Sequence, residues 1–128
     1  MNDEIGYKLG IIWQDVQHRR IVEIIKKLNT NQNVDYKIIF DQLAFYIEDH
    51  FDTEEQYMRE FAYDKTESHI EEHKTFRNRI FGVTNACFSY NAFHSSISLY
   101  LDEWFRNHIL VVDKELAVFL LKCEHNNA

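Results

Sequence analysis

The chain has 128 residues, of which 45% are hydrophobic and 15% aromatic, so it is long enough and apolar enough to form one domain with a buried core. Proline is absent and only three glycines occur, so the chain lacks the turn residues of an all-β fold, and an all-α fold is expected. The formal net charge is -7 and the basic residues are scattered, which argues against nucleic acid and against an anionic membrane as partners.

No membrane-spanning segment is predicted, because no stretch approaches roughly 18 uninterrupted apolar residues. The first ten residues also lack the apolar centre of a signal peptide. We therefore expect a cytoplasmic protein, either a monomer or a weak homo-oligomer. The two cysteines, Cys87 and Cys123, are too few for a disulfide framework, so we expect both to be reduced and buried.

The first half of the chain predicts two helices. Apolar residues recur at helical spacing over 13–28, and the polar run 29–33 ends this first helix. The second helix is predicted over 36–63, and its pattern is compatible with a bend near Phe61. A short polar connection between two such helices places them side by side and antiparallel.

The second half predicts two more helices. The third begins near residues 65–67, where acidic side chains suit a helix N-terminus, and ends before Ser89. The fourth begins at Phe93 or Ile97, and residues 125–128 form a frayed tail.

The predicted architecture is an all-α, up-down-up-down antiparallel four-helix bundle in a single domain, 1–128. The bundle occupies residues 12–122. Residues 1–11 form an N-terminal arm laid against it, and residues 123–128 form the tail.

Residues that commonly bind metals recur on all four predicted helices. They are His18, His50, Glu54, His69, His73, His108 and Asp113. Residues four apart share a helix face, so His50 with Glu54 and His69 with His73 can each converge on one point. The spacing of five between His108 and Asp113 is poorly aligned on an ideal helix, and it predicts either a local π-type turn or a different side-chain reach.

One such pair alone is more often a surface pair than a metal site, so the argument depends on the whole set. Five imidazoles and two carboxylates buried in one core without a cation would leave several polar groups unmatched. Because the ligands include no thiolate, a cysteine-type structural zinc site is disfavoured, whereas imidazole suits Zn, Cu, Fe and Ni. We expect this site to lie off-centre, nearer the end that holds the turn between the second and third helices.

Seven ligands are too many for one ion. Shared between two octahedral ions, five imidazole nitrogens, two bridging carboxylates and one bridging hydroxide fill all coordination positions but one. A small ligand could bind at the position that stays open.

Four segments resemble the hemerythrin family, and in particular its short, single-domain bacterial members. These segments are DVQH (15–18), YIEDHFDTEEQYM (46–58), HIEEH (69–73) followed by Phe76, and WFRNHILVVDK (104–114). The resemblance runs from about residue 7 to residue 121 and includes all seven ligand positions in order.

The resemblance implies a non-haem diiron centre that binds O2 reversibly. One iron would be held by His69, His73 and His108. The other would be held by His18 and His50 and would carry the open position. Bridges between the irons would come from a hydroxide or oxide and from the carboxylates of Glu54 and Asp113.

The resemblance also implies an apolar wall around the open position, which would keep water and reductants from bound O2. By position relative to the ligands, this wall consists of Ile21, Phe51, Trp104, Phe105, Ile109 and Leu116. The chain departs from many relatives at two places near the site. Gln14 stands where they have an aliphatic residue, and Leu116 stands where they have tyrosine.

The expected function is O2 storage, delivery or scavenging without turnover, with O2 as the partner. The alternatives are a diiron enzyme that reduces O2, peroxide or nitrogen oxides, with weak peroxidase- or reductase-type activity, an O2 or redox sensor that acts through a partner, and a metal-free or zinc-bound structural bundle. Histidine-rich ligation favours the binding protein over the enzyme, because ferritin-like oxidases use more carboxylates and Glu-x-x-His pairs.

The remaining histidines and the acidic pairs beside the ligands have simpler expected roles. His94 and His125 match no ligand position, and both are expected in solvent. Glu48 with Asp49, and Glu71 with Glu72, are expected to form solvated faces.

Overall fold

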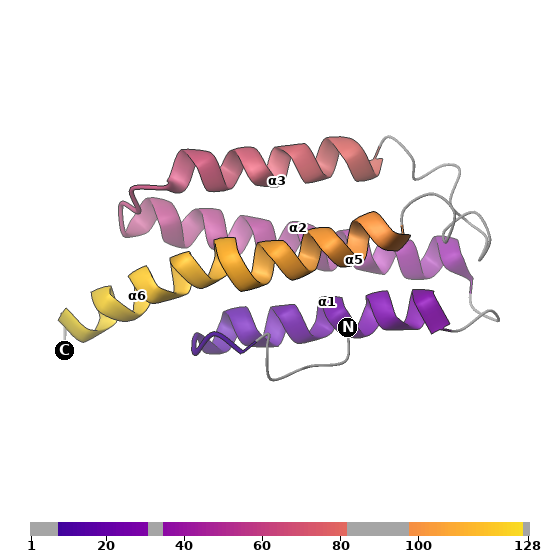
Figure 1. Ribbon diagram of the computed structural model, residues 1–128, viewed down its shortest axis with the longest axis horizontal. Helices are drawn as coiled ribbons and strands as arrows, with labels where there is room; N and C mark the ends of the chain where they lie inside the picture. The colour runs from indigo at the N-terminus through magenta and orange to yellow at the C-terminus, as the bar shows by residue number, and fades with distance from the viewer. Residues whose placement is uncertain (1–7, 31–34, 82–97, 127–128) are drawn as a thin grey trace.

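The computed structural model describes residues 8–30, 35–81 and 98–126, and these form four helical rods packed side by side (Figure 1). The bounds of the helices are α1 Ile12–Thr30, α2 Tyr36–Glu60, α3 Thr66–Phe81, α5 Ser98–Asn107, the π-helical turn η3 His108–Asp113, and α6 Lys114–Asn126. The last three follow one another without a break and make up the fourth rod. Successive rods run antiparallel, and the described ranges contain no strand, so the predicted all-α up-down-up-down bundle is confirmed.

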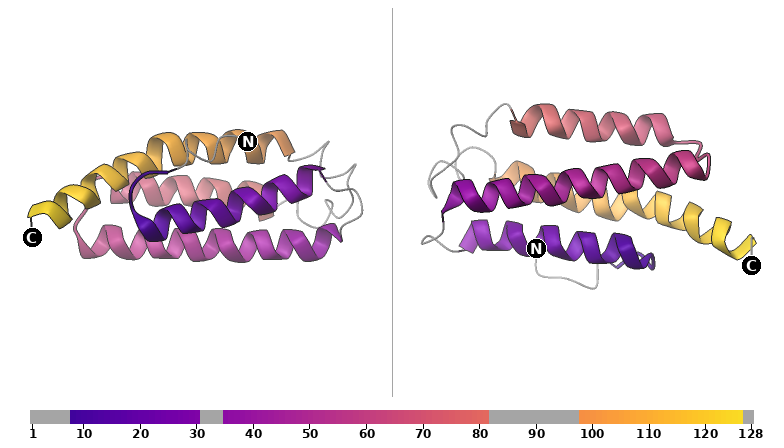
Figure 2. Two further views of the ribbon diagram at one scale, coloured as in Figure 1. Left: turned by 90° about the horizontal axis from the view of Figure 1, so that it is seen from below. Right: turned by 180° about the vertical axis from the view of Figure 1, so that it is seen from behind.

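The helix boundaries lie within a few residues of the predicted ones. Helix α2 ends at Glu60, so the helix stops near Phe61, where the sequence was compatible with a bend. Helix α6 continues to Asn126, so the expected frayed tail does not begin at His125. Its last turns project beyond the other rods at the end that carries the α2–α3 turn (Figure 2). The predicted helix starts at Phe93 or Ile97 and the third helix's limit at Ser89 lie outside the described residues.

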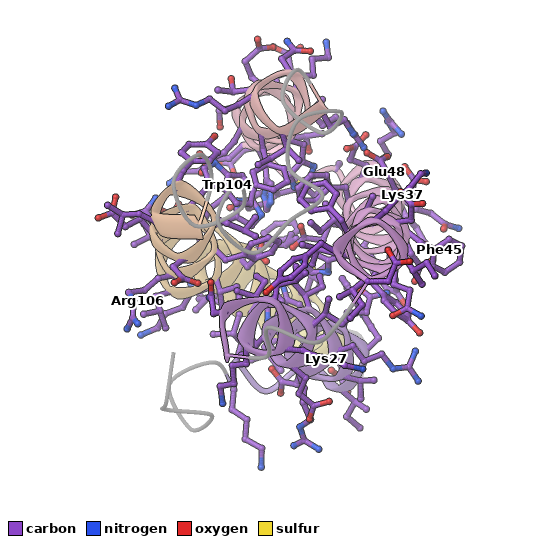
Figure 3. The ribbon with its side chains drawn as sticks, turned by 90° about the vertical axis from the view of Figure 1, so that its right-hand side faces the viewer. Lys27, Lys37, Phe45, Glu48, Trp104 and Arg106 are labelled. Carbon is purple, nitrogen blue, oxygen red and sulfur yellow. The ribbon has the colours of Figure 1, made fainter. Side chains whose placement is uncertain are left out.

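The apolar side chains form two buried clusters. The larger cluster draws on all four rods and includes Phe40, Phe51 and Phe105. The smaller cluster lies toward the α2–α3 turn and includes Met58 and Leu116. Viewed along the bundle axis, the rods surround one interior, into which Trp104 points between α5 and α3, while Lys27 and Arg106 point outward (Figure 3).

Helix α2 has a defined cap at each end. The Asp35 side chain accepts hydrogen bonds from the backbone N–H groups of Lys37 and Ile38, which have no partner within the helix. At the other end, Ala62 N–H donates to the Arg59 carbonyl and Tyr63 N–H donates to the Met58 carbonyl. This pair of bonds is a Schellman motif, and it requires the left-handed backbone that Ala62 adopts, with φ 53°.

The residues just before α1 are hydrogen-bonded to its first turn. The backbone N–H groups of Leu9 and Gly10 donate to the two carboxylate oxygens of Asp15, at 2.7 and 3.1 Å. Gly10 has a φ of +96°, a conformation that glycine adopts without strain. Ile11 is then buried in the smaller apolar cluster. The arm predicted before this point lies largely outside the described residues.

Within the described residues, no helix combines the length and the hydrophobicity that crossing a lipid bilayer requires.

Candidate metal centre

All seven predicted ligand residues lie together in the interior of the bundle. Each is at most 2% exposed, and every rod contributes at least one of them. They lie where the larger apolar cluster meets the smaller one, with Phe51 and Ile109 of the larger cluster among them in the chain. Because they occur early in α1, late in α2 and early in α3, the group lies toward the α2–α3 turn, as the sequence predicted.

The Asp113 carboxylate stands between two pairs of imidazoles. Its Oδ2 atom lies 2.7 Å from Nε2 of His18 and 3.0 Å from Nε2 of His50. Its Oδ1 atom lies 3.1 Å from Nε2 of His69 and 2.9 Å from Nε2 of His108. The two oxygens of one carboxylate therefore face two different sets of nitrogen donors.

The Glu54 carboxylate is surrounded in a less even way. Its Oε1 atom lies 3.2 Å from Nε2 of His73, 3.3 Å from that of His50 and 3.4 Å from that of His69. Its Oε2 atom accepts a hydrogen bond from the Gln14 side-chain amide at 3.2 Å. One oxygen of Glu54 thus faces imidazoles of α2 and α3, and the other faces the side chain of Gln14.

Several of these buried atoms are close to each other without being hydrogen-bonded. Nε2 of His69 and Nε2 of His108 lie 3.1 and 2.9 Å from Oδ1 of Asp113. None of these three atoms has a hydrogen-bond partner among the described residues. Buried polar atoms left in this way are unfavourable. Their lone pairs converge on a shared region instead, which is the arrangement that a cation requires.

Two overlapping groups of donor atoms each fit within 4.8 Å. One consists of Glu54, His69, His73 and His108, and the other of His50, Glu54, His108 and Asp113. Nitrogen and oxygen donors in this mixture suit a transition metal such as iron or zinc better than magnesium or calcium. The residues present therefore fit a metal, and Glu54 and His108 belong to both groups.

Opposite charges hold the same residues together when no metal is bound. Burial favours the neutral form of both carboxyl groups, but the surrounding imidazoles outweigh it and hold the pKa of Glu54 and that of Asp113 well below their usual values. Burial alone would lower the pKa of His69, yet the adjacent carboxylates of Asp113 and Glu54 raise it to about 9. Protons on the imidazoles then supply the positive charge that a metal would otherwise bring.

Burial and the Asp113 carboxylate act in opposite directions on His108, and the carboxylate prevails, so the pKa of His108 lies well above its usual value. For His73, burial is the larger influence, and the pKa is lowered. The imidazoles of the cluster are therefore not equivalent, although they share the same two carboxylates.

Three of the five imidazoles have an oxygen acceptor at their outer nitrogen, Nδ1. The acceptor is Gln17 for His50 at 2.7 Å and Glu55 for His73 at 2.9 Å. For His108, the Glu72 carboxylate lies 3.5 Å from Nδ1. An acceptor at Nδ1 holds the proton there and leaves Nε2 free to bind a metal, so these residues orient the ligands. Each acceptor lies on the rod that precedes its histidine along the chain.

The sequence did not single out these acceptors. Glu72 was expected in solvent, but it is only partly exposed because it packs beside His108. Glu48, also expected in solvent, accepts a hydrogen bond from Arg77 at 2.7 Å. A signal was present, since Gln17, Glu55 and Glu72 each stand next to a ligand in the chain.

The π-type turn proposed from the spacing of five is confirmed. Residues His108–Asp113 form a π-helix, in which the wider turn brings both end residues to the core side. Both side chains are fully buried. The local backbone thus compensates for a spacing that an α-helix would align poorly.

Five of the six residues predicted for the apolar wall lie in or against the larger cluster, and one does not. Phe51 stacks on His73 with ring centroids 3.8 Å apart, and Trp104 stacks on His108 at 4.4 Å. The others in this cluster are Ile21, Phe105 and Ile109, all fully buried. Leu116 is fully buried too, but it belongs to the smaller cluster on the other side of the ligands.

The minor predictions have mixed outcomes. Cys123 is a free thiol that is only partly buried, so the expectation of full burial was wrong there. Cys87 and His94 lie outside the described residues, and so does the side chain of His125.

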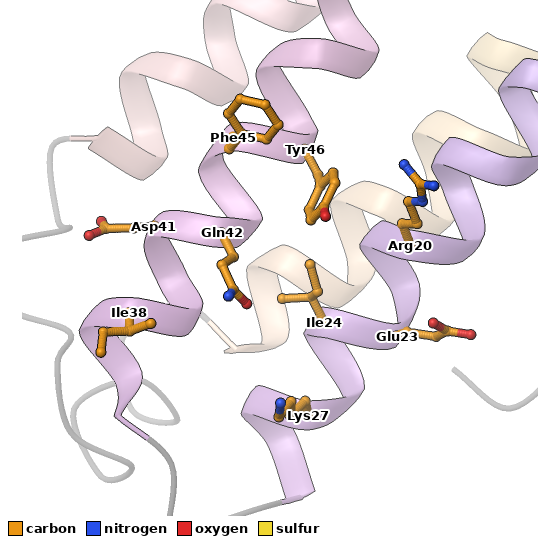
Figure 4. Close-up of a pocket in the computed structure, with 9 residues that line it drawn as sticks. All are labelled: Arg20, Glu23, Ile24, Lys27, Ile38, Asp41, Gln42, Phe45 and Tyr46. Atoms are coloured by element: carbon orange, nitrogen blue, oxygen red, sulfur yellow. The ribbon is translucent and has the colours of Figure 1, made fainter.

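Two cavities differ in their relation to this centre. One of about 760 Å³ lies on the surface between α1 and α2, where Tyr46 and Ile24 point into it (Figure 4). None of the seven predicted ligands lines it. A second, of about 350 Å³, is lined by His69, Glu72 and Glu115 and therefore borders the centre directly.

Comparisons with known proteins agree with this geometry. The chain is 30% identical over 119 residues to a bacteriohemerythrin of Clostridium acetobutylicum, an alignment that covers 85% of this chain and 92% of that one. It is 34% identical over 76 residues to a bacteriohemerythrin of Aquifex aeolicus, covering 56% and 58% of the two chains. A bacteriohemerythrin of Stenotrophomonas maltophilia is 27% identical over 119 residues, covering 90% of this chain and 76% of that one.

No solved structure matches the chain significantly. The sequence profile of the family described as "Hemerythrin HHE cation binding domain" matches residues 9–120. This match spans all four rods and all seven residues of the buried cluster, and it confirms the resemblance noted from the sequence. The chain therefore belongs to the hemerythrin family of HHE cation-binding domains.

Proposed function

We propose that the chain holds two non-haem iron ions and binds O2 reversibly, for oxygen storage, delivery or scavenging. The observation that carries this proposal is the position of Asp113, whose two carboxylate oxygens face two separate pairs of imidazoles. A carboxylate in this position is suited to bridging two ions. Membership of a cation-binding family and the names of the three relatives support the same proposal.

In this proposal the ligands divide into two sets. His69, His73 and His108 hold one iron, and His18 and His50 hold the other. Glu54 and Asp113 bridge the two ions together with a hydroxide or oxide. Iron in such a centre supplies the electrons that stabilise bound O2, whereas the side chains supply the geometry and the surroundings.

The surrounding residues have three tasks. Gln17, Glu55 and Glu72 hold protons on the outer nitrogens and so fix the direction of three imidazoles. Phe51 and Trp104 cover His73 and His108 with flat aromatic faces. Apolar side chains line both sides of the ligand layer and limit the access of water, while the cavity lined by His69 and Glu72 borders the centre on one side.

A binding role is preferred to an enzymatic one because each fully buried acid or base of the described cluster already has a proposed role as a ligand. Every carboxylate and imidazole of the buried group is assigned to a metal in the proposal. The outer acceptors Gln17 and Glu55 are bonded to imidazoles. We therefore assign no catalytic residue.

The test is anaerobic reconstitution of the whole chain with ferrous iron, followed by removal of unbound metal. We expect two irons per chain, and a visible absorption band that appears in air and disappears when O2 is removed under argon. A single iron per chain, no uptake, or a band that never reverses would contradict the proposal. Steady consumption of an added reductant in air would favour the reductase alternative instead.

A further inference from the structure

Gln14 reaches the metal centre although it was not among the predicted ligands. It lies on α1, one turn before His18, and its side chain is fully buried. Its Nε2 atom lies 3.2 Å from Oε2 of Glu54 and 3.3 Å from the backbone carbonyl oxygen of Asp113. Both partners can only accept hydrogen bonds, so the NH2 end of the amide must be the end that faces them.

This contact makes the two oxygens of Glu54 different. Oε1 is surrounded by imidazole nitrogens, with His73 at 3.2 Å, His50 at 3.3 Å and His69 at 3.4 Å. Oε2 accepts the hydrogen bond from Gln14. All three imidazoles of the three-histidine set, including His108 at 3.6 Å, lie near Oε1, together with one of the other set. If Glu54 bridges two ions, Oε1 would serve the ion of the three-histidine set, and Oε2 would be left for the ion held by His18 and His50.

Packing does not account for the amide. The other end of the group, Oε1 of Gln14, is buried and has no hydrogen-bond partner among the described residues. A buried carbonyl oxygen without a partner destabilises a fold, so an apolar side chain of the same length would suit the core better. What the amide adds is its contact with the two carboxylate-bearing residues of the centre.

We propose that Gln14 is a positioning residue of the metal centre, whose amide orients Glu54 and draws electron density from the oxygen that faces the two-histidine ion. This inference rests on the proposed diiron function. Orienting the carboxylate strengthens binding of the second ion, since ligands that are held in place bind more tightly. Drawing electron density from the carboxylate weakens its donation to ferric iron, so the ferrous state is favoured and the reduction potential is raised.

The two effects predict different results from substitution, and both can be measured without an O2-binding assay. In Gln14→Met the side chain keeps its length and loses its donor. We expect the affinity for the second iron to fall about tenfold, and the reduction potential of the centre to fall because ferric iron is no longer disfavoured. The first iron should bind as before.

A second variant separates the position of the amide from its polarity. Asparagine retains the amide but is one methylene shorter, so it does not reach Glu54 from the same backbone position. Gln14→Asn should therefore resemble Gln14→Met in both affinity and potential. Gln42→Met is the matched control, because Gln42 is exposed on α2 and lies away from the ligands.

The experiment is stepwise titration of the metal-free whole chain with ferrous iron, followed by potentiometry of the loaded protein. If the wild type takes up two irons and Gln14→Met shows the same second affinity and the same potential, the inference is wrong and the proposed function stands. A lowered melting temperature with an unchanged potential also overturns it, since that would be a purely structural role. If the wild type takes up fewer than two irons, the proposed function fails, and this inference fails with it.

Discussion

Glu55 accepts a hydrogen bond from Nδ1 of His73 at 2.9 Å, while the adjacent residue Glu54 places its Oε1 atom 3.2 Å from Nε2 of the same imidazole. Two neighbouring residues of α2 thus contact opposite nitrogens of one ring. Because Glu55 lies at the edge of the centre, it can fix the ring without occupying a metal position.

The first prediction concerns this outer contact. Glu55→Leu removes the acceptor, so His73 loses its fixed orientation, and we expect iron affinity to fall about 10- to 100-fold. Competition with a coloured chelator measures the affinity. Glu60→Leu is the control, since Glu60 is exposed at the end of the same helix. Equal affinities in the two variants would contradict an orienting role for Glu55.

The second prediction compares two phenylalanines of α2. Phe51 is fully buried and stacked on His73, whereas Phe45 is 67% exposed. We expect Phe51→Ala to lower the free energy of unfolding by about 3–5 kcal/mol through the lost burial and the cavity. Phe45→Ala should change it by less than about 0.5 kcal/mol. Urea unfolding of the metal-free protein measures both free energies, and similar losses would contradict the burial of Phe51 in the core.

The third prediction concerns the end of α2. Ala62 has a φ of 53°, and this left-handed conformation costs a residue with a Cβ atom roughly 1 kcal/mol that glycine does not lose. Ala62→Gly should therefore stabilise the protein by about that amount. Ala44→Gly, in the middle of α2, should do the opposite by roughly 0.5–1 kcal/mol. Thermal unfolding distinguishes the two signs, and a destabilised Ala62→Gly would argue against the Schellman motif.

The fourth prediction is the pH dependence of the metal-free protein. Its fold holds protons on His69, whose pKa is raised from 6.5 to about 9, and on His108, whose pKa is raised as well. The unfolded chain releases these protons near pH 6.5, so their contribution is complete below that pH and is lost as the pH rises through about 9. Urea unfolding in chelator should therefore show falling stability across this interval.

The two buried carboxylates make stability depend on pH in the opposite direction. The pKa values of Glu54 and Asp113 are lowered in the fold, so their contribution is present above the usual carboxyl values and is lost as the pH falls below them. His73, whose pKa is lowered, adds stability as the pH rises toward its unfolded value of 6.5, because its neutral form is the one that the fold favours, and it makes no difference to the alkaline loss. Added ferrous iron should reverse the alkaline loss, since a metal replaces the protons. Stability that rises between pH 6.5 and 9 without metal would contradict the assigned proton positions.

The sequence was sufficient to predict the architecture and to predict that the seven candidate ligand residues lie together in the core. Apolar spacing predicted four helices, and the ligands fell on their apolar faces, so the core direction of His50 and His69 followed from periodicity alone. The spacing from His108 to Asp113 even indicated the irregular turn, because five residues conflict with 3.6 per turn.

Other features depended on how the rods are rotated against one another, which periodicity does not determine. Glu55 and Glu72 both look like surface residues in the pattern, yet each meets an imidazole of the next rod. Ala62 gives no turn signal, because a glycine is what usually marks a left-handed residue. Leu116 lies in the smaller buried cluster, whereas the other five residues expected in the apolar wall lie in or against the larger one.

The π-helical turn also determines how the fourth rod responds to a change in length. An α-helix advances by about 100° per residue, so residues five apart lie about 140° from each other around its axis, whereas residues four apart lie only about 40° apart. Deleting one residue between Ile109 and Asp113 would therefore let a regular α-helix keep the aspartate on the face of His108, and the downstream leucines on the core side. A one-residue insertion at the same place should be far more damaging, because it would add about a further 100° that the wider turn does not absorb.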